Sequence, residues 1–323
     1  MNKPLLLCFL LFYGCIAIKP TTRIDFDAPD SYPEGIAYDS VRQIYYVSSA
    51  RTGTIGKVSP QGVYSVLHAD SSLKSTYGLK IHPDGKRLFA CVGDANYSKF
   101  TSADTRRKMI RLISVDLTSG KRLSDVDLSG LVPGKHFPND LTFDPTGTIY
   151  MTDSFAHAIY KITPDGQASV LAKDKKFETQ GIGLNGIVYH PSGFLLVDNS
   201  NTGQLYKVPI SNPQNVQKVA IDQYFLGADG LLLSGNNRLT MVVNGGNDKV
   251  FQITTEDNWQ SAQLASTTLI ADRFTYPSTA TRNGKDIWVM NAKFNELVDS
   301  NAIPAKKFAL QLAVLKPVPK PKK

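Results

Sequence analysis

Hydrophobic and polar residues alternate in short runs along this chain, and each run ends at Gly, Pro, Asn or Asp. Beyond residue 20, no long stretch repeats its apolar residues with the 3.6-residue period of an amphipathic helix. Residues 137–153 show the basic unit, because they predict strands at 141–143 and 148–152 joined by the turn Asp-Pro-Thr-Gly. A polar residue stands at each end of this unit: Asn139 before the first strand and Asp153 after the second.

The same unit begins six times along the chain. Its apolar positions are kept while its polar ends vary, at 33–38, 76–81, 138–143, 184–189, 228–233 and 277–282. Third and fourth strands follow, so a four-stranded unit recurs about every 40–60 residues, which is typical of a β-propeller. Six copies predict an all-β protein with six blades. The second unit is longer, because residues 97–108 form a polar insertion that we expect to be a surface loop.

The two ends of the chain predict how the ring closes. The sixth unit lacks a clear fourth strand, whereas the strand-like run at 23–26 precedes the first unit with nothing to pair with. We expect this N-terminal strand to complete the sixth blade, which would protect exposed sheet edges. The propeller then occupies residues 20–315, and the alternation of Pro and Lys predicts a disordered tail at 316–323.

The first 17 residues have the pattern of an export signal. Lys3 gives a short basic region, and residues 5–13 are almost wholly apolar but too few to span a bilayer. Two cleavage sites fit this segment. Cys15 resembles the lipidated cysteine of a bacterial lipoprotein, and cleavage after Ala17 would instead release a soluble protein. Both predict export, to the periplasm, to a membrane through a lipid on Cys15, or to the medium.

Composition narrows the range of partners. The formal net charge is +8, but four of the lysines lie in the tail 316–323, and no segment interleaves basic with aromatic residues. Nucleic acid is therefore not an expected partner. Beyond residue 20, Cys91 is the only cysteine and stands in an apolar strand, so the domain must be stable without an internal disulfide. We expect a monomer that acts on a small molecule and meets a membrane only through Cys15.

Polar residues just ahead of the first strands form the main candidate site. The first strand of each blade lines the channel of a propeller, so equivalent positions converge on one axis; they are Glu34, Tyr77, Asn139, Asn185, Asp229 and Ser278. Two carboxylates and two amides, with no Cys or His, suit a hard cation such as Ca²⁺ more than Zn²⁺. Asn and Asp before Gly also form turns, which is the alternative for Asn185 and Asp229. That alternative does not explain Glu34.

The chain resembles the senescence marker protein (regucalcin)/gluconolactonase family in four motifs: Pro-Glu-Gly at 33–35, Pro-Asn-Asp at 138–140, Leu-Asn-Gly at 184–186 and Ala-Asp-Gly at 228–230. Residues 183–189 and 200–207 are most similar to its plant and bacterial branch, often labelled calcium-dependent phosphotriesterase-like. The resemblance covers about residues 30–295. It implies a six-bladed propeller with one divalent cation, Ca²⁺ or in some members Zn²⁺, Mn²⁺ or Mg²⁺. The implied ligands are Glu34, Asn139, Asn185 and Asp229. The implied reaction is hydrolysis of a lactone or phosphoester, with Asp229 as both ligand and general base.

One departure from this family bears on the substrate. Sugar-lactone members carry an arginine two residues before the third-blade asparagine, where it holds the polar substrate, but this chain has Phe137 there. An aromatic ring cannot form the paired hydrogen bonds of a guanidinium. We therefore expect a substrate less polar than an aldonolactone, in a pocket bordered by Phe137 and Tyr77. The neighbouring His136 is expected in a surface loop, although it is the one residue nearby that could replace the arginine.

Polar residues also recur at the ends of the second strands, at Ser48, Asp153, Asp198, Asn244 and Asn291. We expect them near the channel, one strand further out. Asp153 and Asp198 are the candidates for partners of the metal ligands or for alternative bases, and so for the substrate pocket.

Two functions follow from this reading. The first is an exported, metal-dependent hydrolase of a lactone or related ester. The second is a propeller used as a binding or scaffold module, in which the cation is structural. The four-ligand ring favours the hydrolase, whereas the missing arginine and the lack of a certain base favour the binding module.

Overall fold

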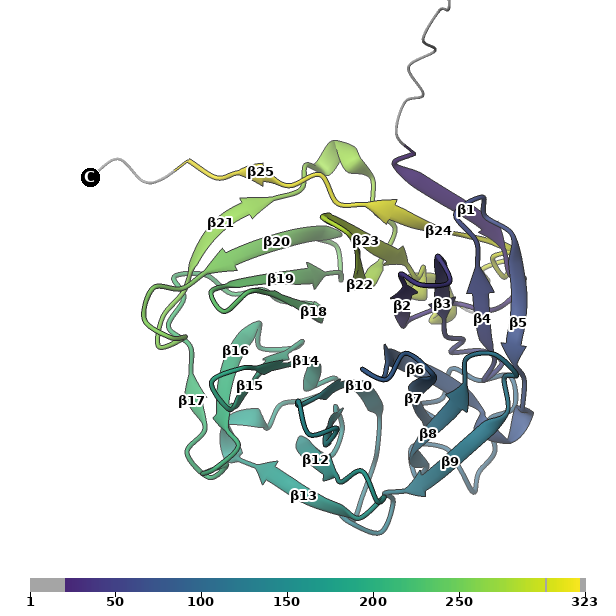
Figure 1. Ribbon diagram of the computed structural model, residues 1–323, viewed down its shortest axis with the longest axis horizontal. Coiled ribbons are helices and arrows are strands. Elements are labelled where there is room, and N and C mark those ends of the chain that lie inside the picture. Colours follow the sequence, from purple (N-terminus) through teal and green to yellow (C-terminus); the bar gives the residue numbers. More distant parts are fainter. Residues whose placement is uncertain (1–20, 300, 320–323) are drawn as a thin grey trace, which may run out of the picture.

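The computed structural model describes residues 21–299 and 301–319, and its strands form six antiparallel sheets around a common axis (Figure 1). The predicted six-bladed, all-β propeller is thereby confirmed. The predicted export signal at 1–17, including Cys15, lies outside the described residues. In the part of the chain that the structure describes, no helix is long and apolar enough to cross a membrane.

The first five blades each use four strands that are consecutive in the sequence. Blade 1 has β2 (Ile36–Asp39), β3 (Ile44–Val47), β4 (Ile55–Val58) and β5 (Tyr64–His68). Blade 2 has β6 (Ser75–Ile81), β7 (Arg87–Gly93), β8 (Ile110–Asp116) and β9 (Arg122–Asp127). Blade 3 has β10 (Pro138–Phe143), β11 (Ile149–Asp153), β12 (Ala158–Ile162) and β13 (Ala168–Lys173).

Blade 4 has β14 (Leu184–His190), β15 (Phe194–Asn199), β16 (Gln204–Pro209) and β17 (Gln217–Lys218). Blade 5 has β18 (Ala228–Ser234), β19 (Arg238–Val243), β20 (Lys249–Thr254) and β21 (Gln263–Thr267). Blade 6 has β22 (Pro277–Asn283), β23 (Asp286–Asn291) and β24 (Lys307–Leu312). Short 3₁₀ helices lie between strands: η1 (Ser71–Leu73), η2 (Lys175–Phe177), η3 (Ile270–Asp272) and η4 (Phe294–Leu297).

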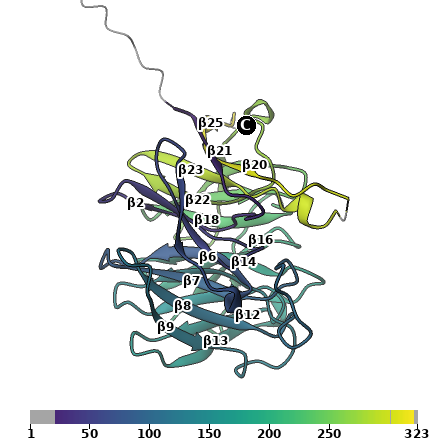
Figure 2. The same ribbon diagram turned by 90° about the vertical axis from the view of Figure 1, so that its right-hand side faces the viewer.

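The N-terminal strand closes the ring, as the sequence predicts. β1 (Arg23–Asp27) pairs antiparallel with β24 and is the fourth strand of blade 6. Figure 1 shows this purple strand beside the yellow β24, and Figure 2 shows purple and yellow segments together at the same side of the ring. Its residues alternate between exposed and buried, and the buried Phe26 ring lies 6.2 Å from that of Phe308 on β24. The period of two thus directs the apolar side chains of β1 into the core.

The start of the predicted disordered tail is a strand instead. β25 (Lys316–Pro317) pairs with Ser266 and Thr267 of β21 and adds a fifth strand to blade 5. The expectation of disorder from residue 316 is wrong for these two residues. An outer strand such as β21 has backbone N–H and C=O groups available for pairing with another strand. Pro is tolerated in the added strand β25, because β25 lies at the edge of the sheet.

Neighbouring inner strands pack backbone against backbone, which fixes the residues at the channel entrance. Four of the six blades have glycine at the same position, in the inner strand or directly before it: Gly35, Gly78, Gly186 and Gly230. A Cβ atom on Gly186 would overlap the carbonyl oxygen of Asp229 in the next blade. Blade 3 has Asp140 at this position and blade 6 has Thr279. The close approach holds each preceding residue at a defined place around the axis.

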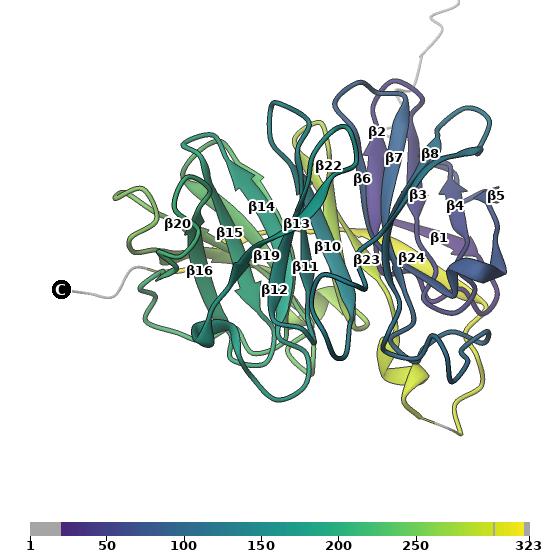
Figure 3. The same cartoon turned by 90° about the horizontal axis from the view of Figure 1, so that it is seen from below.

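The insertion between β7 and β8 is only partly a surface loop. Its buried Asp94 carboxylate accepts hydrogen bonds from the hydroxyls of Thr101 and Thr105 at 2.7 and 2.8 Å. Tyr97 is half-buried and packs against Phe294 of η4, with ring centroids 5.6 Å apart. Figure 3 shows this blue loop and the yellow-green coil of η4 at the same edge of the ring. Because short-range polarity does not report such contacts, the sequence alone predicted exposure.

Candidate active site at the channel entrance

The four predicted ligands lie at or just before the start of their inner strands, and all four side chains are buried. The exposed fractions are 6% for Glu34, 3% for Asn139, 4% for Asn185 and 9% for Asp229. Asn244 donates a hydrogen bond from Nδ2 to Asp229 Oδ2 at 2.6 Å, and Asn139 donates one to Ser154 Oγ at 3.1 Å. Tyr77 and Ser278, the other two members of the ring, are also buried.

Four carboxylates share this buried region, which concentrates negative charge at the axis. Burial raises the pKa of Glu34 well above its usual range, and the charges of Asp229 and Asp140 raise it further. Burial likewise raises the pKa of Asp229, against the opposing effect of the Asn244 hydrogen bond. Asp198 follows the same pattern, through burial and then the charge of Asp229. The negative charges of these carboxylates therefore repel one another, and a bound cation would reduce that repulsion.

Asp140 and Lys80 are part of this region, although the motif analysis did not single them out. Lys80 Nζ lies 3.7 Å from Asp140 Oδ2. Burial raises the pKa of Asp140, and the Lys80 charge lowers it. A signal for Asp140 is present in the sequence, since it stands where four other blades have glycine. A buried carboxylate at a position that otherwise favours glycine indicates a local charge requirement rather than turn chemistry.

Several oxygens in this region have no hydrogen-bond partner. They are Glu34 Oε2, Asn139 Oδ1, Asn185 Oδ1 and Asp198 Oδ2, while Asp140 Oδ2 has only the ion pair with Lys80. Buried polar atoms are almost always paired, so this group of acceptors fits a bound cation with oxygen ligands. Over the described residues there is no cluster of three or more His, Cys, Asp or Glu arranged to hold a metal. The predicted ligand set has two such residues and two amides.

Strand register separates the two acids predicted at the second-strand ends. Asp153 pairs with Pro138 in blade 3, whereas in blade 4 the equivalent Leu184 pairs with Asn199. Asp198 therefore corresponds to Thr152, one residue before Asp153. A one-residue offset turns a side chain to the other face of the sheet. The alignment of Asp153 with Asp198 was wrong, because a bulge in each inner strand hides the offset.

Of these two acids, only Asp198 therefore belongs to the same buried region as the four predicted ligands. Its Oδ1 accepts a hydrogen bond from the backbone of Gly186 at 3.1 Å, and its Oδ2 is unpaired. Asp153 instead accepts five hydrogen bonds, from His136 Nδ1, Tyr160 Oη and the backbone amides of Phe137, Phe155 and Ala156. With its acceptor positions used in this way, Asp153 is a structural anchor for the loop that carries Phe137.

His136 is not a surface residue, contrary to expectation. Its side chain is buried, and its Nδ1 lies 2.6 Å from Asp153 Oδ2. The sequence could not show this pairing, because the two residues come together only through the turn of β10 onto β11. Cys91 is buried as expected, and burial raises the pKa of its thiol well above the usual range, which disfavours a nucleophilic thiolate.

A cluster of aromatic rings, which we call the roof, includes Tyr77 of the channel-entrance ring. Phe137 is buried, and its ring centroid lies 4.9 Å from that of Tyr77, 5.5 Å from Phe155 and 6.1 Å from Tyr97. Burial raises the pKa of Tyr276 to about 12, and the charge of Asp229 contributes to this shift. Burial also raises the pKa of Tyr97, and the charge of Asp229 adds to this shift. Two phenol groups therefore lie within electrostatic reach of Asp229, next to a largely apolar surface.

These shifts predict how stability depends on pH in the absence of a cation. Because the pKa values of Glu34, Asp198 and Asp229 are raised, the folded protein binds more protons than the unfolded chain above about pH 4. The free energy of unfolding should then fall as pH rises from about 5 to 8. Lowered carboxyl pKa values such as that of Asp84, about 2, act only below this window. Burial lowers the pKa of His157, which opposes the carboxylates within the window, but this is one group against three. Thermal unfolding in EDTA should give a higher Tm at pH 5 than at pH 8, and Glu34→Gln should reduce the difference. An equal Tm at both values would contradict the charge crowding.

The comparisons with known proteins support the fold. No model of a protein family matches the chain, and no curated protein sequence matches it. The major allergen Mala s 1 of Malassezia sympodialis matches with a TM-score of 0.73 and 19% identity, over 92% of this chain and 97% of that one. A protein assigned as a gluconolactonase matches with a TM-score of 0.58 and 17% identity, over 93% and 96%. Virginiamycin B lyase from Staphylococcus aureus matches with a TM-score of 0.56 and 15% identity, over 90% and 99%.

At these identities the likeness shows the overall fold and nothing finer. The gluconolactonase among the similar structures agrees with the family resemblance in the sequence at the level of the fold. The plant and bacterial branch stays a prediction. A shared propeller fold does not by itself assign an activity.

Proposed function

We propose that the chain is a metal-dependent hydrolase of a lactone or related ester, with its site at the entrance of the channel. One divalent cation, Ca²⁺ in preference to Zn²⁺, Mn²⁺ or Mg²⁺, would be held by Glu34, Asn139, Asn185 and Asp229. The observation that carries this proposal is the coincidence of crowded buried carboxylates with unpaired amide and carboxylate oxygens. An all-oxygen set suits a hard cation.

The residues around the ligands have separable roles in such a reaction. When bound, the cation supplies a Lewis acid for the ester carbonyl and makes water a better nucleophile. Asn244 fixes the orientation of the Asp229 carboxylate through its 2.6 Å hydrogen bond. Asp229 and Asp198 are the two candidates to accept the proton of the attacking water, and Asp198 has a free oxygen for it. Tyr97 and Tyr276 are phenol donors next to Asp229 that could bind a substrate oxygen.

The roof supports a substrate of low polarity. Phe137, where sugar-lactone members of the resembled family have arginine, packs among Tyr77, Tyr97 and Phe155. Such a surface binds an alkyl or aryl group by apolar contact and offers no charged partner for a polyhydroxylated acid. We therefore favour a lactone or ester with an apolar substituent.

A non-catalytic binding module with a structural cation is the second candidate. The observation that favours it is the burial of Phe137 within the roof, where Tyr97 contacts both Phe137 and Phe294. A substrate would need this segment to move before it reaches the ligands.

The test is a panel of substrates assayed after removal of metals and addition of one cation at a time. We expect hydrolysis of alkyl lactones or aryl esters with Ca²⁺ or Mn²⁺, and at least about tenfold slower turnover of gluconolactone. Cation binding, measured in parallel by calorimetry, separates the two candidates. Binding without turnover of any substrate would support the binding module, and absence of binding would refute the ligand ring itself.

A further inference from the structure

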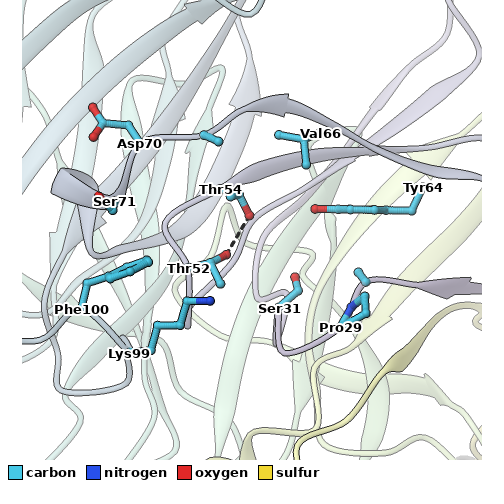
Figure 4. Close-up of a pocket in the computed structure, with 12 residues that line it drawn as sticks. Pro29, Ser31, Thr52, Thr54, Tyr64, Val66, Asp70, Ser71, Lys99 and Phe100 are labelled. Carbon is cyan, nitrogen blue, oxygen red and sulfur yellow. Dashed lines mark hydrogen bonds between the residues drawn. The ribbon is translucent and has the colours of Figure 1, made fainter.

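A second pocket lies at the outer side of blade 1, away from the channel (Figure 4). It encloses about 400 Å³, within the range of small-molecule sites. Its lining comes from the segment before β2, the loop before β4, the outer strand β5, residues 69–71 that follow β5, and Lys99 and Phe100 of the insertion. The pocket is thus assembled from parts of the chain that have no role in the proposed hydrolysis.

A series of hydrogen-bonded hydroxyl groups leads into this pocket, and the direction of donation is fixed along the series. Ser49 donates its proton to the backbone carbonyl of Ser31 at 2.6 Å, so it must accept from Thr52 Oγ1 at 2.7 Å. Thr52 has then used its own proton and must accept from Thr54 Oγ1 at 2.8 Å. Because each hydroxyl has a single proton, Thr54 ends the chain with its donor already used. Thr52 and Thr54 therefore offer no proton to a ligand.

The remaining polar groups at the centre are donors. The Ser31 hydroxyl is buried and has no partner, and Figure 4 shows it directed into the pocket, as are the Tyr64 hydroxyl and the Lys99 ammonium. Lys99 makes no ion pair within the described residues; its Nζ lies 5.3 Å from the centroid of the Phe100 ring. The unpartnered Ser31 hydroxyl and the Lys99 cation thus face the same space, together with the Tyr64 hydroxyl, which also reaches Thr54.

The one acid in the lining does not neutralise this cation. Asp70 points away from the centre in Figure 4. Its carboxylate is used by Arg122 at 3.2 Å and by the backbone amide of Ser72 at 2.8 Å. The centre of the pocket therefore has a net positive charge and attracts an anion.

The walls of the pocket are apolar and leave hydrophobic surface uncovered. The Tyr64 ring lies flat against Gly56, where a Cβ atom would overlap it, and is nearly parallel to Phe26 at a centroid distance of 6.1 Å. Val66 is 51% exposed and Phe100 is 36% exposed. A planar or branched apolar group could cover these side chains while remaining close to Lys99.

We propose that this pocket binds a small organic acid, with its apolar body against Tyr64, Val66 and Phe100 and its carboxylate toward Lys99 and the hydroxyls of Ser31 and Tyr64. The donors satisfy both carboxylate oxygens, and the buried Ser31 hydroxyl gains the partner that it lacks.

The probe is benzoate, titrated into the full chain and followed by NMR or calorimetry, with benzyl alcohol as the neutral analogue and inorganic phosphate as the bare anion. We expect saturable binding of benzoate, weaker binding of benzyl alcohol and no binding of phosphate. Lys99→Met should weaken benzoate binding at least about tenfold and leave benzyl alcohol unaffected. Ser31→Ala and Tyr64→Phe should each weaken benzoate several-fold. The matched control is Lys121→Met, at an exposed lysine outside the pocket.

Three results would contradict binding of an organic acid in this pocket. Failure of benzoate to bind, or equal affinity in wild type and Lys99→Met, overturns the proposal, as does phosphate binding that equals benzoate binding. Gly56→Val, which displaces the Tyr64 ring, should weaken both benzoate and benzyl alcohol. The cation-dependent Tm shift and hydrolysis at the channel should be the same in Lys99→Met as in wild type, so failure here is distinguishable from failure of the hydrolase proposal.

Discussion

Asp229→Asn should remove the rise in Tm that we expect Ca²⁺ to give to the wild type, and with it any cation-dependent hydrolysis. Asp229 is buried within electrostatic reach of Glu34, Asp140 and Asp198, and its orientation is fixed by Asn244. Loss of a direct carboxylate ligand should exceed the tenfold to hundredfold effect typical of outer-shell partners, so we expect cation affinity to fall at least about 100-fold. Differential scanning fluorimetry with and without Ca²⁺ measures this directly.

The same substitution should have the opposite effect on the metal-free protein. Replacing one of several crowded carboxylates by an uncharged amide relieves repulsion, so in EDTA at pH 8 the variant should have a higher Tm than the wild type. Asp222→Asn, at an exposed position, is the control and should change neither quantity. A variant that loses the Ca²⁺ effect because it is misfolded would show a lower Tm in EDTA. Retention of the full Ca²⁺ shift in Asp229→Asn would rule out this residue as a ligand.

Phe26→Ala should destabilise the whole domain by about 3–5 kcal/mol, the range found for truncating a buried phenylalanine. The Phe26 side chain is 2% exposed and packs between Phe308 of β24 and Tyr64 of β5, so it joins blades 6 and 1 at the closure of the ring. Urea unfolding, followed by tryptophan fluorescence, gives the free energy of unfolding. The control is Val41→Ala, at a side chain that is 87% exposed, which should change stability by less than about 0.5 kcal/mol.

Equal losses for the two variants would mean that β1 contributes little to the ring. A second variant tests whether the loss of stability comes from the contact between the two strands. Phe308→Ala truncates the partner of Phe26, and the double variant should lose less than the sum of the two single losses, because the residues are in contact.

Repetition made the architecture predictable from the sequence. Six copies of the same apolar pattern fix the number of blades, and an unpaired strand at each end predicts the closure of blade 6 by β1. The pattern also identifies the positions of Glu34, Asn139, Asn185 and Asp229, since these depend only on distance from the start of a strand.

Features that depend on exact register or on distant contacts were not predictable. The shift that separates Asp153 from Asp198 arises at bulges that leave the apolar pattern unchanged. The burial of His136 depends on Asp153 in the next strand, and the position of Tyr97 depends on η4, almost 200 residues later. Nothing in the local sequence around these residues differs from that of an ordinary polar loop.

The joining of the chain's two ends in blade 6 has a consequence for the order of folding. Blades 1 to 4 are built from consecutive strands, so each could form as soon as its own segment is available. Blade 6 cannot, because the contact between Arg23 and Gln311 spans 288 residues. Contacts at such separation form slowly, since the intervening chain must first be ordered. β1 should therefore remain unpaired until β24 is in place. Closure of the ring should be the final and slowest step of folding.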